Sequence, residues 1–297
     1  KTIMTRCIHC TRCVRFSTEV AAVTDMGALG RGESMEITTY LEKALESELS
    51  GNVIDLCPVG ALTSKPYSFV SRPWELKKTE TIDVMDAIGS NIRVDTRGGE
   101  VLRVLPRVNE DINEEWISDK ARFSCDGLKR QRLDKPFVRK DGKLVPASWD
   151  EALSVVADKM KQISPEAIAV LVGDQCEAES MFALKCLAEK LGIENIDCRQ
   201  DGAKINTDSR ASYLFNSTIA GIEDADAVLL IGTNPRWEAP VLNARIRKRW
   251  LETRLPIALI GEEYDLTYDV DYLGNSALLL EQILQRQHSF SEILAEA

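Results

Sequence analysis

The sequence lacks several features that would indicate an ordinary enzyme or a membrane protein. It has two histidines in 297 residues, which makes a histidine-based acid–base site hard to build, and it has no P-loop, GxGxxG turn or nucleophile elbow. No apolar run approaches the roughly 20 residues that a bilayer-spanning helix needs. The net charge of −10 would repel nucleic acid and an anionic membrane surface. These absences predict a soluble or peripheral protein with no independent catalytic site, no membrane span and no nucleic-acid partner.

The composition is that of an ordinary globular chain, with 44% hydrophobic and 28% charged residues, and the length suffices for two or three domains. The chain begins at Lys1 rather than at Met, and its last alternation of strands and helices breaks off at Ala297. We therefore expect a processed or truncated piece of a longer protein.

Three regions of different pattern follow one another. Residues 1–77 hold closely spaced cysteines, a glycine-rich turn and a predicted helix over 39–49. Residues 78–135 form a predicted β-rich domain with a tight turn at Gly98-Gly99 and a short helix over 113–122. In residues 136–297, a hairpin that turns at Asp141-Gly142 precedes buried apolar runs that alternate with amphipathic stretches, which is typical of a parallel α/β layer. The predicted fold class is α/β.

The other predicted elements follow from hydrophobic periodicity and capping signals. The predicted strands are 81–85, 90–95, 101–105, 167–172, 193–197, 227–231 and 257–260. The predicted helices are 148–163, 177–191, 240–251 and 276–286.

The most specific motif is a run of three cysteines, Cys7, Cys10 and Cys13, followed at a distance by Cys57-Pro58. Three thiolates two residues apart wrap a loop around one face of a cubic cluster, and the fourth iron takes a ligand from elsewhere in the chain. Proline after the remote cysteine removes a backbone donor and turns the chain away from the sulfur. The spacing predicts one [4Fe-4S] cluster bound by Cys7, Cys10, Cys13 and Cys57.

Other interpretations of the motif are a four-thiolate zinc site, which is usually built from two C-x2-4-C knuckles, and unliganded core cysteines. His9 lies inside the triplet and is expected to point away from the metal, where it could tune the potential. The remaining thiols are scattered, and a chain of this kind fits a reducing compartment. We interpret Cys125 as structural, Cys176 and Cys186 as packed or free surface thiols, and Cys198 as lacking any motif partner.

A single cluster passes electrons between neighbours, and the sequence holds no second set of ligands. The electron donor and acceptor must therefore lie in partner chains or in an upstream part of the protein.

Several stretches resemble one family, the large peripheral iron–sulfur subunit (seventy-five-kilodalton subunit) of respiratory complex I, NADH:ubiquinone oxidoreductase, in its mitochondrial and α-proteobacterial form. The stretches that carry the resemblance are 4–16, 47–66, 109–120, 127–132, 232–235 and 243–248. The resemblance implies a subunit of an H+-translocating NADH:ubiquinone reductase that relays single electrons from the NADH/flavin side toward quinone through one [4Fe-4S] cluster.

The same resemblance implies partners among the other peripheral-arm subunits, including the flavin/NADH-binding subunit and iron–sulfur subunits on the quinone side. It implies a place on the matrix side of the mitochondrial inner membrane, or on the cytoplasmic side of the inner membrane in a bacterium.

Residues 136–297 resemble molybdopterin oxidoreductases such as formate dehydrogenases, and residues 78–135 resemble a cluster-bearing domain of those enzymes with its cysteines lost. Ser118 stands where the last of those cysteines would fall. Near the position of a molybdenum ligand, Cys198 has the wrong register and Gly202-Ala203 offers neither Cys nor Ser. We therefore expect no second cluster and no molybdopterin. A molybdenum-dependent catalytic subunit and a zinc-stabilised assembly module are the alternative functions.

Two further features have two interpretations each. Gly232-Thr233-Asn234-Pro235 follows a buried strand, where it could hold a pterin dinucleotide or be a turn kept by the fold alone. The basic clusters 129–132 and 245–249 could dock acidic faces of neighbouring subunits or form solvated helix flanks.

Overall fold

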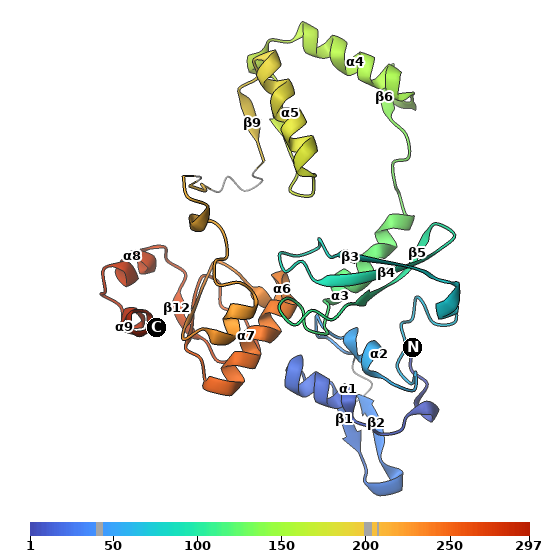
Figure 1. Ribbon diagram of the computed structural model, residues 1–297, viewed down its shortest axis with the longest axis vertical. Coiled ribbons are helices and arrows are strands. Elements are labelled where there is room, and N and C mark those ends of the chain that lie inside the picture. Colours follow the sequence, from blue (N-terminus) through green and yellow to red (C-terminus); the bar gives the residue numbers. More distant parts are fainter. Residues whose placement is uncertain (40–43, 199–203, 207) are drawn as a thin grey trace. The chain divides into compact units, whose positions relative to one another are not determined.

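A computed structural model describes residues 1–39, 44–198, 204–206 and 208–297. The chain divides into two units, of which the first combines Lys1–Lys129 with Asn216–Ala297 and the second is Arg130–Phe215 (Figure 1). The first unit thus joins segments that are far apart in the sequence, and it contains all four motif cysteines. Within the described residues, no helix is both long and apolar enough to cross a membrane.

The N-terminal part of the first unit consists of short elements. These are η1 (Met4–Arg6), α1 (Arg12–Arg15), the π-helical turn η2 (Phe16–Val20), β1 (Met26–Leu29), η3 (Gly32–Ser34), β2 (Glu36–Thr39) and α2 (Asn52–Leu56). Strands β1 and β2 pair in antiparallel fashion. Phe16, Leu49, Val53 and Val241 share one buried cluster, and the Phe16 ring lies 4.9 Å from that of Trp116. The core beneath the cysteine loop therefore draws on three distant segments.

The helix predicted over 39–49 is wrong in the residues that the structure describes. Thr39 ends β2, residues 44–47 are irregular and residues 48–50 form a turn, whereas 40–43 lie outside the described residues. Gly51 precedes α2 instead of ending a helix, and its N–H donates to Asp119 Oδ1 at 2.6 Å. A Cβ at Gly51 would lie 2.7 Å from side-chain atoms of Asp119 and Arg122, so close packing explains the glycine.

The middle of the chain forms an antiparallel sheet in the order β3-β4-β5. Its elements are η5 (Pro73–Glu75), β3 (Lys77–Ile82), β4 (Asn91–Arg97), β5 (Glu100–Pro106), α3 (Asp119–Phe123) and η6 (Ser124–Lys129). Gly98 and Gly99 have φ of 59° and 84°, which confirms the predicted turn between β4 and β5. Ile92, Val104, Ile117 and Ala121 form the buried core between the sheet and α3.

Two predictions in this part differ from the structure. The first strand is Lys77–Ile82 rather than 81–85; the bond from Asp83 N–H to the Ser90 carbonyl continues its pairing with β4, and the chain then turns. The helix predicted over 113–122 is only Asp119–Phe123. Asn113 is fully buried, and its amide accepts from Asn91 N–H and donates to backbone carbonyls, which holds this segment as a turn.

The C-terminal part of the first unit is a parallel sheet in the order β10-β11-β12 with helices around it. Its elements are η9 (Ala220–Asp224), β10 (Val228–Ile231), α6 (Pro235–Glu238), α7 (Pro240–Thr253), β11 (Ile257–Ile260), β12 (Asp271–Gly274), α8 (Leu278–Leu284) and α9 (Phe290–Glu296). Strand β11 is buried along its whole length. The predicted strands over 227–231 and 257–260 are confirmed and pair in parallel, whereas β12 and α9 are additional elements.

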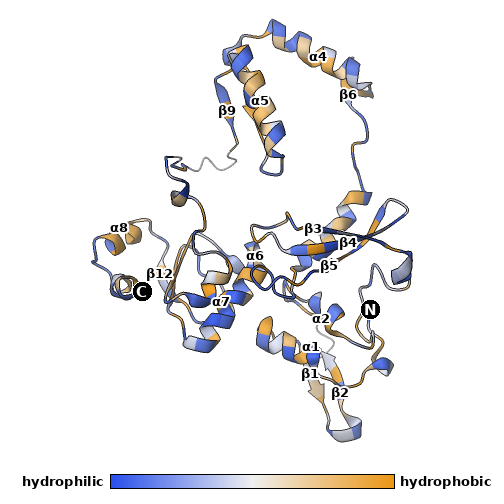
Figure 2. Ribbon diagram, viewed as in Figure 1, coloured by the Kyte–Doolittle hydropathy of each residue, from blue (hydrophilic) through white to orange (hydrophobic). Residues whose placement is uncertain are grey.

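The second unit contains a hairpin and a separate pair of parallel strands. Its elements are β6 (Phe137–Lys140), β7 (Lys143–Pro146), α4 (Trp149–Gln162), η7 (Pro165–Ala167), β8 (Ala169–Leu171), α5 (Ala178–Leu191), β9 (Asn195–Asp197) and η8 (Arg210–Ser212). Ser148 Oγ accepts from Glu151 N–H at the start of α4, as its capping box predicts. Helix α5 carries an apolar stripe on which Phe182 and Leu187 remain exposed (Figure 2). The α/β fold class is confirmed in both units.

Candidate metal centre

The four motif cysteines line one small cavity of the first unit. Cys7 directly follows η1, Cys13 lies in α1, Cys57 ends α2, and Cys10 lies in the loop before α1. All four are unbridged thiols of intermediate exposure. The cavity is completed mainly by the apolar side chains of Met4, Ile8, Ile37, Pro58, Val59, Ala61 and Leu62. The four cysteines that the sequence motif groups together therefore also lie together in the fold.

The loop that carries the triplet has an unusual backbone. His9 and Thr11, which flank Cys10, have φ of 54° and 60°, in the left-handed region. Such angles are uncommon for residues other than glycine, and they concentrate at ligand-holding and active sites. The two left-handed residues curl the loop, so that the cysteines of the triplet line the same cavity.

The first residues of the chain are tied to the loop that follows Cys57. Ile3 N–H donates to the Ala61 carbonyl at 2.8 Å, Thr63 N–H donates to the Lys1 carbonyl at 2.9 Å, and Thr2 pairs with Leu62 in an antiparallel bridge. This pairing brings the triplet loop and Cys57 together although more than forty residues separate Cys13 from Cys57.

The sulfur atoms receive backbone hydrogen bonds of the kind that stabilise thiolates. His9 N–H donates to Cys7 Sγ and Leu62 N–H donates to Cys57 Sγ, each at 3.4 Å. Burial raises the pKa of the Cys13 thiol; backbone hydrogen bonds in α1 oppose this, and negative charge on Cys10 and Cys57 adds to it. Four thiolates in one cavity repel one another unless cations lie among them. The donor set therefore fits an iron–sulfur cluster, whose irons each take one thiolate.

In the part of the chain that the structure describes, no three His, Cys, Asp or Glu side chains form a group that could hold a metal ion as they stand. The four cysteines nevertheless line one cavity. The two observations differ because ligands of one ion must converge on a single point, whereas ligands of a multi-iron cluster bind separate irons and stand farther apart. The shared cavity is the observation relevant to a cluster.

Helix α7 of the C-terminal part packs against the segment that directly follows Cys13. Val241 is 2% exposed and packs in the buried cluster with Phe16, three residues after Cys13. Arg247 Nε donates to the Glu19 carbonyl at 3.4 Å, at the end of η2. Beside α7, Arg236 Nε lies 3.0 Å from Glu48 Oε1. No local sequence signal indicated these contacts, because they join segments about 190 to 230 residues apart.

The basic cluster over 245–249 bonds largely within the chain: Arg245 is buried, which contradicts a solvated flank at that position, whereas Lys248 keeps 43% of its side chain exposed. Arg245 is 3% exposed and lies 2.8 Å from Glu223 Oε1. Lys248 Nζ lies 2.7 Å from Glu114 Oε1, and Arg249 donates to the Ala225 carbonyl. Arg245 and Arg249 thus bond within the α/β part of the first unit, and Lys248 links this part to the middle of the chain.

Polar groups of the Gly232–Pro235 turn form hydrogen bonds with the adjacent helix α6. Asn234 Oδ1 caps α6 by accepting from Trp237 N–H, and Asn234 N–H donates to Glu238 Oε1 at 2.9 Å. Thr233 Oγ1 donates to the second oxygen of the same carboxylate. These hydrogen bonds favour the interpretation of a turn kept by the fold.

Ser118 is the N-cap of α3, where its hydroxyl accepts from Ala121 N–H at 3.1 Å. Cys125 packs at the edge of the core beneath the β3–β5 sheet, and burial raises the pKa of its thiol. Cys176 and Cys198 are exposed and Cys186 is half-buried. Gly202 and Ala203, which the sequence placed near a molybdenum ligand position, lie outside the described residues.

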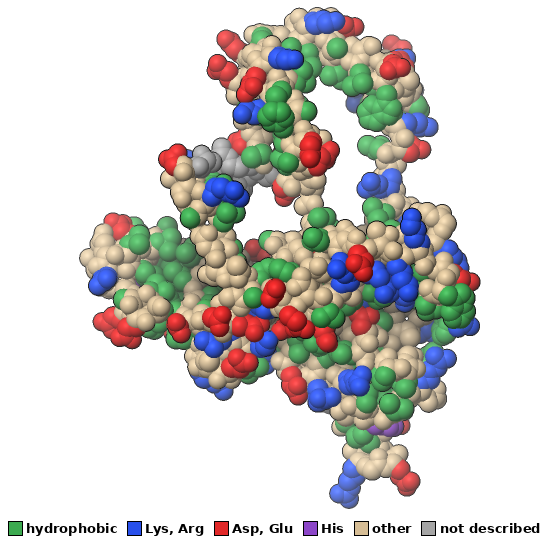
Figure 3. Space-filling view, viewed as in Figure 1, with side chains coloured by type: hydrophobic (Ala, Val, Ile, Leu, Met, Phe, Trp, Pro, Cys, Tyr) green, Lys and Arg blue, Asp and Glu red, His purple; other side chains and the backbone are tan. Residues whose placement is uncertain are grey.

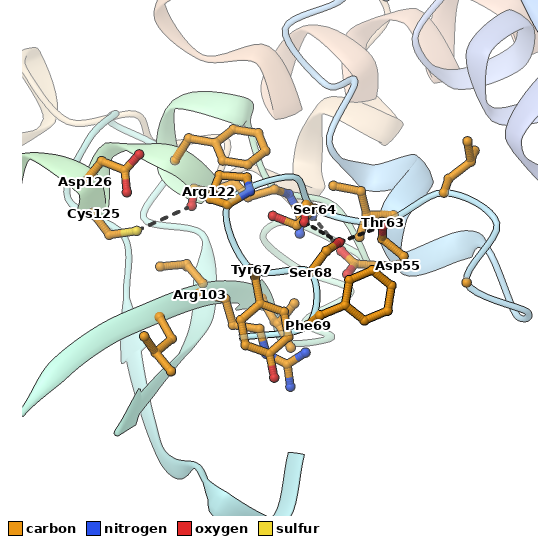
Figure 4. A pocket seen from close by; sticks show the side chains of 18 residues that line it. Asp55, Thr63, Ser64, Tyr67, Ser68, Phe69, Arg103, Arg122, Cys125 and Asp126 are labelled. Carbon is orange, nitrogen blue, oxygen red and sulfur yellow. Dashed lines mark hydrogen bonds and ion pairs between the residues drawn. The ribbon is translucent and has the colours of Figure 1, made fainter. Parts of the chain in front are cut away.

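A larger cavity, of about 300 Å³, lies next to the loop that follows Cys57 (Figure 4). The sequence pattern gave no sign of it. Its walls come from α2, residues 60–69, strand β5 and α3 with the start of η6. The Arg122 guanidinium lies within hydrogen-bonding distance of Asp55, at 2.5 Å, and Ser68 Oγ lies 2.7 Å from Thr63 Oγ1. The polar groups of the wall thus bond largely to one another.

Comparisons with known proteins give the family. A model described as "Molybdopterin oxidoreductase" matches residues 132–297, more than half of the chain. A model of the ferredoxin-like domain of NADH-quinone oxidoreductase subunit 3 matches residues 1–63, and a model of the NDSU1/NuoG-like 4Fe-4S domain of NADH-ubiquinone oxidoreductase matches residues 76–126. The chain belongs to the molybdopterin oxidoreductase family.

Two relatives are similar to this chain over nearly all of its length. A subunit of the NADH-quinone oxidoreductase of Rickettsia bellii is 57% identical over the whole chain, which covers 44% of that protein. The mitochondrial 78 kDa subunit of NADH-ubiquinone oxidoreductase of Candida albicans is 58% identical over 96% of the chain and 40% of that protein. The predicted resemblance to the large iron–sulfur subunit of complex I is confirmed, and the chain spans less than half the length of these relatives. The models that match residues 1–63 and 76–126 are named for a ferredoxin-like domain and a 4Fe-4S domain.

Proposed function

We propose that this chain is an electron-transfer part of NADH:ubiquinone oxidoreductase and that it holds one [4Fe-4S] cluster on Cys7, Cys10, Cys13 and Cys57. The observation that carries the proposal is the common cavity lined by these four thiols, in a region that matches a ferredoxin-like domain. When bound, such a cluster accepts and donates one electron at a time. We propose one cluster and not two, because residues 76–126, which match a 4Fe-4S domain, contain Cys125 as their only cysteine.

The residues of the chain would act by holding the ligands and setting their environment. The N–H groups of His9 and Leu62 donate to sulfur, which favours the thiolate and shifts a reduction potential upward. The apolar wall around the cavity limits the access of water, which also affects the potential. His9 contributes through its backbone in this arrangement.

The electron donor and acceptor would be other subunits of the peripheral arm, including the flavin/NADH-binding subunit and iron–sulfur subunits on the quinone side. The names of the relatives support this assignment, since they are subunits of NADH-quinone and NADH-ubiquinone oxidoreductases. We place the chain on the matrix side of the mitochondrial inner membrane, or on the cytoplasmic side of the inner membrane in a bacterium. The domain limits 1–77, 78–135 and 136–297 remain a prediction.

The test is the metal and acid-labile sulfide content of anaerobically purified protein, with EPR after reduction by dithionite. We expect about four iron and four sulfide per chain and a reduced-cluster signal. Cys57→Ala should lose or alter that signal, whereas the control Cys125→Ala, outside the motif, should keep it. Zinc without sulfide would contradict the proposal in favour of an assembly module, and molybdenum with pterin would favour a catalytic enzyme.

A further inference from the structure

We propose that a divalent cation that prefers oxygen ligands, Ca²⁺ or Mg²⁺, binds between the side chains of Asp83, Asp86 and Ser90, here called the loop site. These residues lie in the segment that connects β3 to β4 in the first unit. The inference goes beyond the proposed function, because it requires neither an iron–sulfur cluster nor an electron-transfer partner.

The loop site contains three buried oxygen atoms that form no hydrogen bond. Asp83 is 5% exposed and Ser90 is 1% exposed. Among the described residues, five buried side-chain atoms lack a hydrogen-bond partner, and three of the five are Asp83 Oδ2, Asp86 Oδ2 and Ser90 Oγ. Buried polar atoms are nearly always bonded, because a group that loses its hydration without a partner destabilises the fold. The concentration of such atoms in one loop indicates a ligand taken from solution.

Strand pairing places the side chains of Asp83 and Ser90 beside each other. Ile82 of β3 pairs with Asn91 of β4, and Asp83 N–H donates to the Ser90 carbonyl at 2.8 Å, which continues the pairing by one residue. Residues directly opposite in an antiparallel pair point to the same face of the sheet, with Cβ atoms about 4.5–5.5 Å apart. Ile92, two residues after Ser90, lies in the core between the sheet and α3, so this face is the interior one.

The loop also brings Asp86 to this pair. Asp86 Oδ1 accepts from Ile88 N–H at 3.1 Å, and Gly89 turns the chain with a φ of 66° just before Ser90. Burial raises the pKa of Asp83, and the negative charge of Asp86 raises it further, so the two carboxyl groups lie close enough to repel each other. Burial raises the pKa of Asp86 as well. A cation between the two carboxylates would relieve this repulsion.

The three oxygens suit a hard divalent cation. Carboxylate and hydroxyl oxygens bind Ca²⁺ and Mg²⁺, both of which also accept backbone carbonyls and water as further ligands. Two carboxylates balance the charge of one such ion. The charge of Lys120 lowers the pKa of both carboxyl groups, but Lys120 does not bond to either Oδ2 atom. Because one of its three groups is a hydroxyl, the loop site is not a group of three His, Cys, Asp or Glu, the kind that the described residues lack.

Surface charge does not explain cation binding in this part of the molecule. Lys and Arg side chains gather over the β3–β5 sheet on the face seen in Figure 3. A basic surface repels cations, so an ion that binds here has to be held by specific oxygens. The free oxygens of the loop site are already inside the fold, so they stay buried whatever lies against the surface.

The test is the melting temperature of the anaerobically purified chain after passage over a chelating resin. Calcium or magnesium chloride is added to about 10 mM, which exceeds the dissociation constants of weak protein calcium sites. We expect a rise of roughly 3 °C or more over choline chloride of equal ionic strength. Asp83→Asn and Ser90→Ala should each lose the rise. The control Glu80→Gln, in β3, should keep it, because the Glu80 side chain is 66% exposed and lies outside the loop site.

Ser90→Ala keeps both carboxylates, so its loss of the rise would show coordination by the hydroxyl rather than screening of charge. Equal melting temperatures of the unmodified chain in all three salts would overturn the proposal, and so would an undiminished rise in Asp83→Asn. Insensitivity to cations with a higher melting temperature at about pH 5 than at about pH 7 would overturn it in favour of a proton shared by the two carboxyl groups. Iron and sulfide contents of the same samples report on the proposed function separately.

Discussion

Replacing Val241 by alanine tests whether the C-terminal part of the first unit holds the cysteine site. Val241 is 2% exposed and packs with Phe16, Leu49 and Val53. The substitution removes two methyl groups and leaves a cavity, which costs about 2–3 kcal/mol in the free energy of unfolding. For a unit of this size the melting temperature should fall by roughly 4–10 °C.

If α7 and the cysteine helix open together, the same free energy raises the population of the open form about 30- to 150-fold. We therefore expect the amide hydrogens of residues 12–20 to exchange faster by that factor, and an iron chelator to remove the cluster correspondingly faster. Val156→Ala in α4 is the matched control, because Val156 is 52% exposed and its truncation should change stability by less than about 0.5 kcal/mol. A lower melting temperature with unchanged exchange over residues 12–20 would refute the reasoning.

Three further predictions concern buried polar groups of the first unit. Arg245→Met should cost about 2 kcal/mol in denaturant unfolding, because Glu223 loses the cation at 2.8 Å and keeps only Lys248, at 3.1 Å; equal stability of both proteins would contradict a role for the pair. Ser118→Ala should cost about 1 kcal/mol in the same assay because α3 loses its N-cap, and an equal stability of both proteins would contradict the capping role. Burial raises the pKa of Asp83 and of Asp86 above their ordinary values, so their charge destabilises the fold as pH rises through the folded-state pKa. Asp83→Asn or Asp86→Asn should therefore raise the melting temperature at neutral pH and leave it unchanged below about pH 4.

Features encoded in short stretches of sequence were predicted well. The cysteine spacing, the capping box at Ser148 and the turn at Gly98-Gly99 each depend on neighbouring residues, and the structure has the cap and the turn where the pattern indicates them. Strand β11 was predicted from its continuous apolar run, which indicates burial on both faces. Strand β12 was missed because only its pairing with β11 identifies it.

Errors arose where distant residues decide the local conformation. Asn113 is at the centre of a turn because its side chain bonds to Asn91 and Arg107, and nothing in residues 109–120 alone shows this. The basic run over 245–249 has the composition of a solvated flank, yet Arg245 is buried against Glu223. Charge patterning predicts how much charge a segment carries, but the orientation of each side chain depends on the fold.

The contacts of α7 give the α/β part of the first unit a role that requires no ligand of its own. Thr233 and Asn234, at the end of β10, bond to Glu238, so polar groups of this turn have partners within the chain. Val241 and Arg247, farther along, contact η2, which directly continues α1, the helix that carries Cys13. Because the potential of a cluster depends on burial and on the hydrogen bonds to sulfur, a rigid support for that helix keeps both constant. With the proposed cluster bound, the α/β part would serve electron transfer by holding the ligands of another part of the chain in place.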